Sequence, residues 1–386
     1  MSRFSTAAFW ALLVAGCSSG DGDGDGGPAA SPPSGGVPPP SGPAPEPPAA
    51  DPPFAASALF VLGDSLSDVG NAAGTADYLL NAVMDPPTVG LCNPADVLVL
   101  PRPCDDLFHQ QSRVSDGPVA VEHLAAHLKL GELEPSLHLI PARPRSGTGY
   151  AVAGAKARGQ TDADLGRQLD WLLLDHAPLP ADAVYVLMIG GNDAIDALQA
   201  DSAEASAVPR PSAAIVTAAV TAIGRAVERL RDFGARRLVV ANVPDLATLP
   251  AVRAAARASG AELATLAAAA TISEAFDREL DAVLDGIEAN GQWLTPAPLV
   301  IERADVRAAL AGARQATAAE GGNTDDACFD SDLYRSSADA VRVFHPDCAP
   351  ITPGATPRFA EFVFWDGIHP TGRAHAAIGA SLSAHF

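Results

Sequence analysis

The stretch ALFVLGDSLSDVGN, residues 58–71, decides the fold of this chain. Its first part, Ala58–Leu62, is apolar and favours a strand, whereas the Gly, Asp, Ser and Asn that follow are residues of tight turns. The change predicts a buried strand that runs directly into a loop carrying Ser65. In a doubly wound sheet, ligands bind beyond the carboxyl ends of the strands, so Ser65 is placed to present its hydroxyl at the mouth of a crevice. A solvated turn without any chemistry is the alternative interpretation of this segment taken alone.

Short apolar runs and helical patterns alternate along the rest of the chain. Further strands are expected at Tyr150–Ala153, Val184–Ile189, Leu238–Ala241 and Leu299–Ile301. Helices are expected at Asp164–His176, Ala213–Phe233, Glu262–Glu288, Ala304–Gln315 and after Pro370. Buried strands that alternate with helices predict an α/β fold, in which helices cover both faces of a mainly parallel sheet. We therefore expect one three-layer α/β/α domain over residues 57–386, with a doubly wound sheet of five strands. Residues 75–145 form a long insertion between the first two strands, which we expect to shape or cover a substrate cleft.

The composition excludes one class of partner. The chain has 386 residues, of which 48% are hydrophobic, and its net charge is −21. A large core is therefore available, but the basic patch that phosphate binding requires is not, so no nucleic acid partner is expected. An acidic surface also gives no electrostatic help in docking onto anionic lipid headgroups.

The N-terminus has the pattern of an export signal. Arg3 precedes the mostly apolar stretch Phe4–Ala15, which is too short to span a bilayer as a helix. The segment ends in Leu13-Val14-Ala15-Gly16-Cys17, which resembles a bacterial lipoprotein cleavage box with Cys17 as the acylated residue. An ordinary signal peptide with a chance cysteine is the alternative. We expect residues 1–17 to be a lipoprotein signal peptide, and no membrane-spanning helix further along.

The segment that follows the signal is predicted to be a spacer. Residues 18–56 are rich in proline and glycine and contain no basic residue, so they cannot bury enough apolar surface to fold. The prediction is therefore an exported protein of the bacterial cell envelope, lipid-anchored at the outer membrane on its periplasmic or surface face. Its membrane contact would be through the N-terminal lipid alone.

Four cysteines remain, and export into an oxidising compartment favours disulfides. They are Cys92, Cys104, Cys328 and Cys348. The nearest pairs in sequence are Cys92–Cys104 and Cys328–Cys348, but four cysteines allow three connectivities, and a pairing of Cys328 with Cys92 or Cys104 stays open. Free buried thiols are the other alternative. No C-x-x-C spacing is present, so no zinc site is expected, nor any other metal or cofactor.

Two more polar segments follow expected strands. Gly190-Gly191-Asn192-Asp193 ends the third strand, which places Asn192 at the same sheet edge as Ser65. Its side-chain amide can donate a hydrogen bond to a developing oxyanion. The second strand ends in Ala153-Gly154, where the Gly154 N–H is a possible second donor. Tight-turn chemistry is the alternative for both.

The C-terminal segment contains a base and a carboxylate three residues apart. It reads Trp365-Asp366-Gly367-Ile368-His369-Pro370. Histidine is the natural base for a serine nucleophile, and a carboxylate fixes the tautomer of the histidine. One short turn can aim both side chains at Ser65, although a lone D-x-x-H also fits a helix N-cap.

These blocks together resemble the GDSL or SGNH hydrolase family. In chain order they are Gly63-Asp64-Ser65-Leu66, Arg113–Gly117, Gly154, Gly191-Asn192-Asp193, Asn242–Leu246 and Asp366–Thr371. One departure is that Ala153 precedes Gly154, where the family usually has two consecutive glycines. The resemblance implies the flavodoxin-like α/β/α fold of that family.

The resemblance also implies roles for the site residues. Ser65 would be the nucleophile, His369 the base and Asp366 the residue that orients it. The oxyanion hole would consist of the Ser65 N–H, the Gly154 N–H and the Asn192 amide. The expected activity is hydrolysis of a carboxylic ester, small or lipid, through an acyl-enzyme.

Three other functions stay open at this point. A phospholipase or an acyltransferase would use the same site. A catalytically inactive, surface-binding lipoprotein is the alternative from another class, and it gives no reason for Ser65, Asn192, Asp366 and His369 to occur together.

Overall fold

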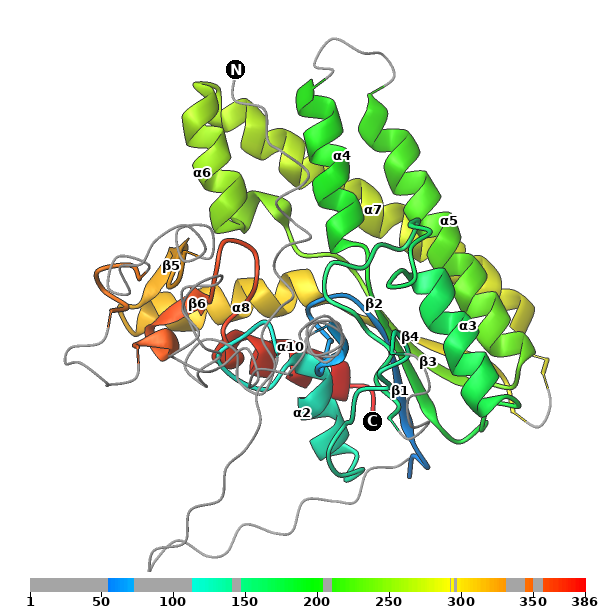
Figure 1. Cartoon of the computed structure of the whole chain (residues 1–386). Helices are drawn as coiled ribbons and strands as arrows, with labels where there is room; N and C mark the ends of the chain where they lie inside the picture. The colour runs from blue at the N-terminus through cyan, green and yellow to red at the C-terminus, as the bar shows by residue number, and fades with distance from the viewer. Residues whose placement is uncertain are drawn as a thin grey trace, which may run out of the picture.

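A parallel sheet lies at the centre of the computed structural model (Figure 1). The structure describes residues 55–72, 113–140, 147–203, 210–291, 293–294, 297–330, 344–349 and 357–386. The strands are β1 (Leu59–Gly63), β2 (Val184–Met188), β3 (Arg237–Ala241) and β4 (Val300–Ala304). They are hydrogen-bonded in the order β1-β2-β3-β4, all parallel. The expected α/β fold with a mainly parallel sheet is thus confirmed.

Helices form a layer on each side of the sheet (Figure 1). One group comprises α3 (Leu165–His176), α4 (Gly191–Ala203), α5 (Pro211–Asp232) and α7 (Glu262–Gly291). The other comprises α2 (Ala120–His127), α8 (Val306–Ala319) and α10 (Gly372–Ser383). The short α6 (Pro250–Ser259) leans on α7, beyond the carboxyl ends of the strands (Figure 1).

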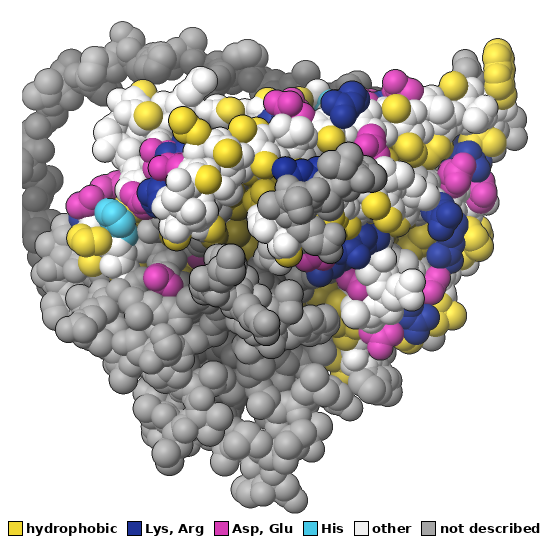
Figure 2. Space-filling view, turned by 90° about the horizontal axis from the view of Figure 1, so that it is seen from above, with side chains coloured by type: hydrophobic (Ala, Val, Ile, Leu, Met, Phe, Trp, Pro, Cys, Tyr) yellow, Lys and Arg dark blue, Asp and Glu magenta, His cyan; other side chains and the backbone are white. Residues whose placement is uncertain are grey.

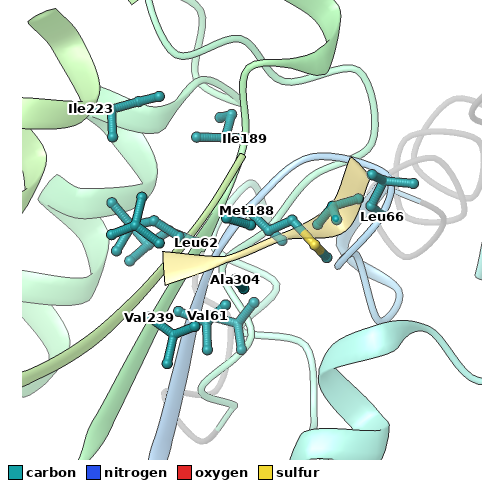
Figure 3. Close-up of a cluster of buried hydrophobic side chains, with 14 of the residues drawn as sticks. Val61, Leu62, Leu66, Met188, Ile189, Ile223, Val239 and Ala304 are labelled. Atoms are coloured by element: carbon teal, nitrogen blue, oxygen red, sulfur yellow. The ribbon is translucent and has the colours of Figure 1, made fainter. Parts of the chain in front are cut away.

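The strands are buried on both faces, as their unbroken apolar runs predict. Every residue of β1 and β2 is buried. Figure 3 shows Val61, Leu62, Met188 and Val239 in one apolar cluster. Leu62 has no exposed surface, so its truncation to alanine should cost roughly 2–5 kcal/mol. This core fixes the strand ends, and with them the loops that carry the polar residues.

The expected fifth strand, Tyr150–Ala153, is corrected by the structure. The segment runs parallel beside β1 and is bonded to it through Tyr150 N–H to Val61 O (2.7 Å) and Val152 N–H to Gly63 O (3.2 Å). It is nevertheless not a regular strand of the sheet. On its outer side, the Asn71 amide donates to Ala151 O and to the carbonyl of the preceding Gly149, each at 2.8 Å. Backbone pairing on that side is limited to an isolated bridge between Pro135 and Gly149. The described sheet therefore has four strands, with this segment along the β1 edge.

A small second sheet was not predicted from the sequence. It pairs β5 (Asn323–Ala327) with β6 (Phe362–Phe364), and β6 leads directly into Trp365 and Asp366. Two short 3-10 turns, η4 (Leu246–Thr248) and η5 (Phe359–Glu361), precede α6 and β6.

Several predictions fall on residues that the structure does not describe. Cys17, Cys92, Cys104 and the 18–56 spacer lie almost wholly outside the described residues, as does most of the 75–145 insertion. The described part of that insertion contains α2, which packs on α10. Among the described residues, no helix has both the length and the apolarity to cross a membrane.

Candidate active site

Ser65, His369 and Asp366 come together although the serine and the histidine are 304 residues apart in sequence. His369 Nε2 lies 2.8 Å from Ser65 Oγ, and His369 Nδ1 lies 2.9 Å from each carboxylate oxygen of Asp366. All three side chains are almost completely buried, so most water is kept away from these contacts. With Nδ1–H donating to the carboxylate, Nε2 is left as an acceptor that can take the serine proton.

The loop that carries Ser65 is held by a buried carboxylate. Asp68 accepts the backbone N–H groups of Gly70 (2.8 Å), Asn71 (2.7 Å) and Ala72 (3.1 Å). Its Oδ2 also accepts the N–H of Ala153 at 2.8 Å. Asp68 therefore ties the serine loop to the segment that leads into Gly154.

The end of β1 is fixed from α3. Gln168 accepts the Gly63 N–H (2.9 Å) and donates to the Gly63 carbonyl (2.8 Å). A side chain thus bonds both backbone groups of the residue two places before Ser65, which limits movement of the nucleophile.

The turn that carries His369 begins where β6 ends. Asp366 Oδ1 accepts the N–H groups of Ile368 (2.9 Å) and His369 (2.8 Å), so the carboxylate that orients the ring also closes the turn. Trp365 N–H donates to His369 O at 2.8 Å across the same turn. Thr371 then caps α10, and its hydroxyl donates to Phe362 O at 3.0 Å.

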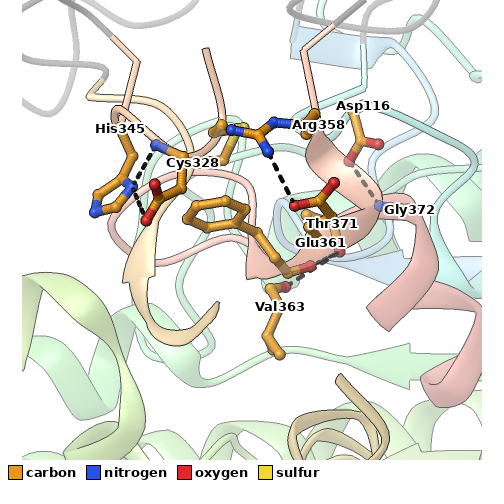
Figure 4. Close-up of a disulfide and its surroundings, with 11 residues drawn as sticks. Asp116, Cys328, His345, Arg358, Glu361, Val363, Thr371 and Gly372 are labelled. Atoms are coloured by element: carbon orange, nitrogen blue, oxygen red, sulfur yellow. Dashed lines mark hydrogen bonds and ion pairs between the residues drawn. A yellow bond between two sulfur atoms is a disulfide. The ribbon is translucent and has the colours of Figure 1, made fainter. Parts of the chain in front are cut away.

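The segment before α2 supports this turn from the other side. Ser115 Oγ donates to Pro370 O (3.2 Å), and Asp116 accepts the Gly372 N–H (2.8 Å), as Figure 4 shows for Asp116. A Cβ on Gly372 would lie 2.8 Å from the Gly117 Cα, so glycine is required by this close approach.

Three groups could serve as oxyanion donors. Gly154 has φ +82°, in the left-handed region, with open space where a Cβ would stand. Within the described residues, the N–H groups of Ser65 and Gly154 have no hydrogen-bond acceptor. Asn192, at the start of α4, donates one amide proton to Ala155 O at 2.9 Å and keeps a second. The bond to Ala155 orients the amide before any substrate arrives.

Buried carboxylates surround the site, and their pKa values move in opposite directions. Burial alone would raise the pKa of Asp366, but the charge and hydrogen bonds of His369 and two backbone N–H groups hold it below its ordinary value. Burial raises the pKa of Asp64 to about 7. Burial also raises the pKa of Asp193 to about 6, although Ala157 and Arg158 donate to its carboxylate. Asp366 is therefore the carboxylate that stays ionised beside the base.

The structure pairs Cys328 with Cys348, which selects one of the connectivities left open by the sequence. Cys328 N–H donates to Phe364 O (3.0 Å), and Phe329 N–H donates to Trp365 O (2.9 Å). The backbone at the bridged Cys328, labelled in Figure 4, is thus hydrogen-bonded to the segment that leads into Asp366. It sits in an apolar cluster of Cys328, Phe329, Phe344, Cys348, Phe359, Phe362 and Trp365, separate from the main core.

Two hollows of the described surface lie away from Ser65. One of about 240 Å³ lies between α2 and β1, and one of about 500 Å³ between α2 and α10. On the face seen in Figure 2, the described basic side chains are interspersed with acidic ones. Across the part of the chain that the structure describes, no three His, Cys, Asp or Glu residues are grouped to hold a metal ion.

The structure adds residues that the sequence analysis missed. Asp68, Gln168 and Asn71 have no separate role in the motifs but hold the loops in place. The signal that could have revealed them is polarity, because all three are polar residues within segments that are otherwise buried.

Comparison with known proteins agrees with this geometry. The family model described as GDSL-like Lipase/Acylhydrolase matches residues 59–382, a span that contains Ser65, Gly154, Asn192, Asp366 and His369. No curated protein matches the chain.

Proposed function

Since the chain belongs to the GDSL-like Lipase/Acylhydrolase family, we propose that it hydrolyses carboxylic esters through an acyl-enzyme on Ser65. Membership of this family makes it an enzyme that acts on ester or acyl bonds, with small-molecule or lipid esters as the substrate class. The observation that carries the proposal is the 2.8 Å contact between Ser65 Oγ and His369 Nε2.

In the first half of the reaction, Ser65 Oγ attacks the ester carbonyl carbon while its proton moves to His369 Nε2. The carbonyl electron pair moves onto oxygen, and Asp366 stabilises the imidazolium that forms. Collapse of the tetrahedral intermediate releases the alcohol, which takes the proton from His369. Water, deprotonated by His369, then attacks the acyl carbonyl carbon. Collapse of this second tetrahedral intermediate breaks the bond to Ser65 Oγ, which takes the proton back from His369, and the acid is released.

The developing oxyanion would be bound by three donors that need no rearrangement. The Ser65 and Gly154 N–H groups lack acceptors within the described residues, and Asn192 is already oriented by its bond to Ala155. Donors that are fixed before the reaction stabilise the transition state without a cost in reorganisation.

We also propose that the enzyme is exported and anchored by a lipid on Cys17. The support is the sequence alone: a short apolar signal, the Gly16-Cys17 junction and a Pro/Gly-rich spacer. The spacer would separate the catalytic domain from the membrane surface.

The test is turnover of chromogenic esters of increasing acyl length, with and without an acceptor alcohol. Ser65→Ala should abolish turnover and leave the fold intact, because the two side chains are nearly isosteric. Ser67→Ala is the matched control in the same loop, and it should keep turnover. Hydrolysis by the Ser65→Ala protein near the wild-type rate would refute the assignment. A fully inactive wild-type protein would favour the binding lipoprotein, and acyl transfer exceeding hydrolysis would favour the acyltransferase.

A further inference from the structure

Asp193 is a buried carboxylate on the helix that carries one oxyanion donor, and the catalytic steps above do not use it. It follows Asn192 in the first turn of α4 and has no exposed surface. Its side chain bonds outside its own helix, because Oδ2 accepts the Ala157 N–H at 2.7 Å and Oδ1 accepts the Arg158 N–H at 3.3 Å. The carboxylate therefore joins the start of α4 to the segment that follows Gly154.

The segment around Gly154 is held by a carboxylate on each side. Before Gly154, the Ala153 N–H donates to Asp68 Oδ2 at 2.8 Å. After it, the Ala157 N–H donates to Asp193. The N–H of Gly154 itself has no acceptor within the described residues. Its direction is therefore set by the bonds on either side of it.

The start of α4 meets this segment at two points. Asn192 Nδ2 donates to Ala155 O at 2.9 Å, and Asp193 accepts from Ala157, two residues further on. One bond alone would leave the helix free to turn about the contact. Two bonds from adjacent residues of the helix fix both its distance from the segment and its rotation.

Positive charges compensate the buried carboxylate. Arg158 Nε lies 3.4 Å from Asp193 Oδ1, and the same guanidinium bonds to Asp196. Lys156 Nζ also lies 2.7 Å from Asp196. Burial raises the pKa of Asp193 to about 6, so at pH 8 its side chain is ionised and only accepts hydrogen bonds.

We propose that Asp193 is a positioning residue that, together with Asp68, sets the spacing between the Gly154 N–H and the Asn192 amide. This inference rests on the proposed function, since both groups would bind the oxyanion of that reaction. An oxyanion donor acts only when it lies within hydrogen-bond distance of the oxygen that becomes charged. Loosening the contact should therefore weaken transition-state binding and leave ester binding nearly unchanged.

The first experiment measures kcat and KM of Asp193→Asn at pH 8. Asparagine keeps the shape but replaces one acceptor oxygen by an amide donor, so one of the two bound N–H groups loses its acceptor. We expect kcat to fall about tenfold with little change in KM. This is less than the 10²–10³-fold that removal of a donor costs, because the donors are displaced and not removed.

Asp201→Asn is the matched control on the same helix. Asp201 also joins α4 to another element, since its Oδ1 accepts the Ser212 N–H of α5 at 2.9 Å. It lies at the end of α4 away from Asn192, so its loss should loosen the helix without moving an oxyanion donor. This variant should keep the wild-type kcat and KM.

A double-mutant cycle tests whether Asp193 acts through Asn192. In an Asn192→Ala background one of the two positioned donors is already gone. Asp193→Asn should then lower kcat by only about threefold, compared with about tenfold in the wild-type background. A role in stability alone would lower kcat by the same factor in both backgrounds.

A further measurement does not depend on turnover. Hydrogen exchange of residues 153–158, followed by peptide mass spectrometry, should be at least about tenfold faster in Asp193→Asn, because the segment loses its bond to α4. If Asp193→Asn does not fold, Asp68→Asn loosens the same segment from the other side of Gly154. It should show the same fall in kcat at constant KM.

The results distinguish the two proposals. A loss of kcat that is equal in both backgrounds, a loss matched by Asp201→Asn, or unchanged exchange of residues 153–158 would overturn the role of Asp193. Turnover that survives Ser65→Ala would instead overturn the proposed function. The exchange measurement would still decide whether Asp193 holds the segment.

Discussion

His375 gives a quantitative prediction about acid stability. It lies in the first turn of α10, has no exposed surface, and neither ring nitrogen has a hydrogen-bond partner among the described residues. Burial, reinforced by the nearby charges of His369 and His123, lowers its pKa to about 3. The folded protein therefore keeps this ring neutral at a pH where the unfolded chain, with an ordinary value near 6.5, binds a proton.

The direction and size of the change in stability follow from the difference between the folded and unfolded pKa values of His375. Because the folded pKa is depressed, stability is fully present above about pH 6.5 and is lost as the pH falls toward the folded value. Between pH 8 and pH 5, the free energy of unfolding falls only over the last 1.5 or so pH units, from about 6.5 to 5. At about 1.4 kcal/mol per pH unit, the loss is about 2 kcal/mol. Any folded pKa below about 4 gives the same figure at pH 5.

The perturbation is His375→Leu, which removes the titrating group and keeps an apolar side chain of similar size. Urea unfolding of both proteins at pH 8 and pH 5 gives the free energy of unfolding. Buried carboxyls such as Asp64 and Asp193, whose pKa values are raised, act in the opposite sense but do so in both proteins and cancel in the comparison. The wild-type protein should lose about 2 kcal/mol more than the variant between the two pH values. An equal change in both proteins would refute the reasoning.

Three further predictions concern the site, the disulfide and the anchor. Asn192→Ala should lower kcat on the order of 10²–10³-fold with little change in KM, and a loss wholly in KM would show that Asn192 binds substrate instead. The Cys328–Cys348 bridge closes a loop with a sequence separation of 20, so its loss should cost roughly 3 kcal/mol. Because the bridge is bonded to the segment before Asp366, reduction should lower activity before circular dichroism detects global unfolding, and unchanged activity of the fully reduced, alkylated protein would contradict this. Cys17→Ser should block lipid attachment, which mass spectrometry of the mature N-terminus would detect; an unmodified N-terminus in the wild-type protein would rule out the anchor.

The strands and long helices were predictable because their burial appears in the sequence. Val184–Ile189 is an unbroken apolar run, and all of it except Ile189 forms the fully buried β2 (Val184–Met188). The helix predicted at Ala213–Phe233 begins at Pro211, since proline suits the first turn, and ends at Asp232. Periodicity identifies such elements because their own residues decide both conformation and burial.

Other elements depend on contacts that no local pattern contains. Tyr150–Ala153 has strand composition, but on its outer edge it meets the Asn71 side chain and, at the preceding Gly149, only an isolated bridge to Pro135, so no regular ladder forms there. The strand β5 reads Asn323-Thr-Asp-Asp-Ala, a polar segment that pairs with β6 from more than thirty residues away. Its conformation comes from that pairing, so its composition did not predict a strand.

In the candidate site too, some residues could be predicted from their local sequence, whereas others depend on contacts that only the folded chain makes. Ser65, Asn192 and His369 were identifiable because each stands in a short segment of turn residues next to an apolar run. The role of Asp68 was not identifiable, because it depends on which backbone N–H groups face its carboxylate in the folded chain.

The most direct test of the central claim is to trap the acyl-enzyme. The protein is mixed with a chromogenic ester, quenched in acid during turnover, digested, and analysed by peptide mass spectrometry. The account predicts the mass of the acyl group on Ser65 in the wild-type protein and no acyl peptide in Ser65→Ala. Ester turnover accompanied by acylation of a different residue, or undiminished turnover in Ser65→Ala, would contradict it.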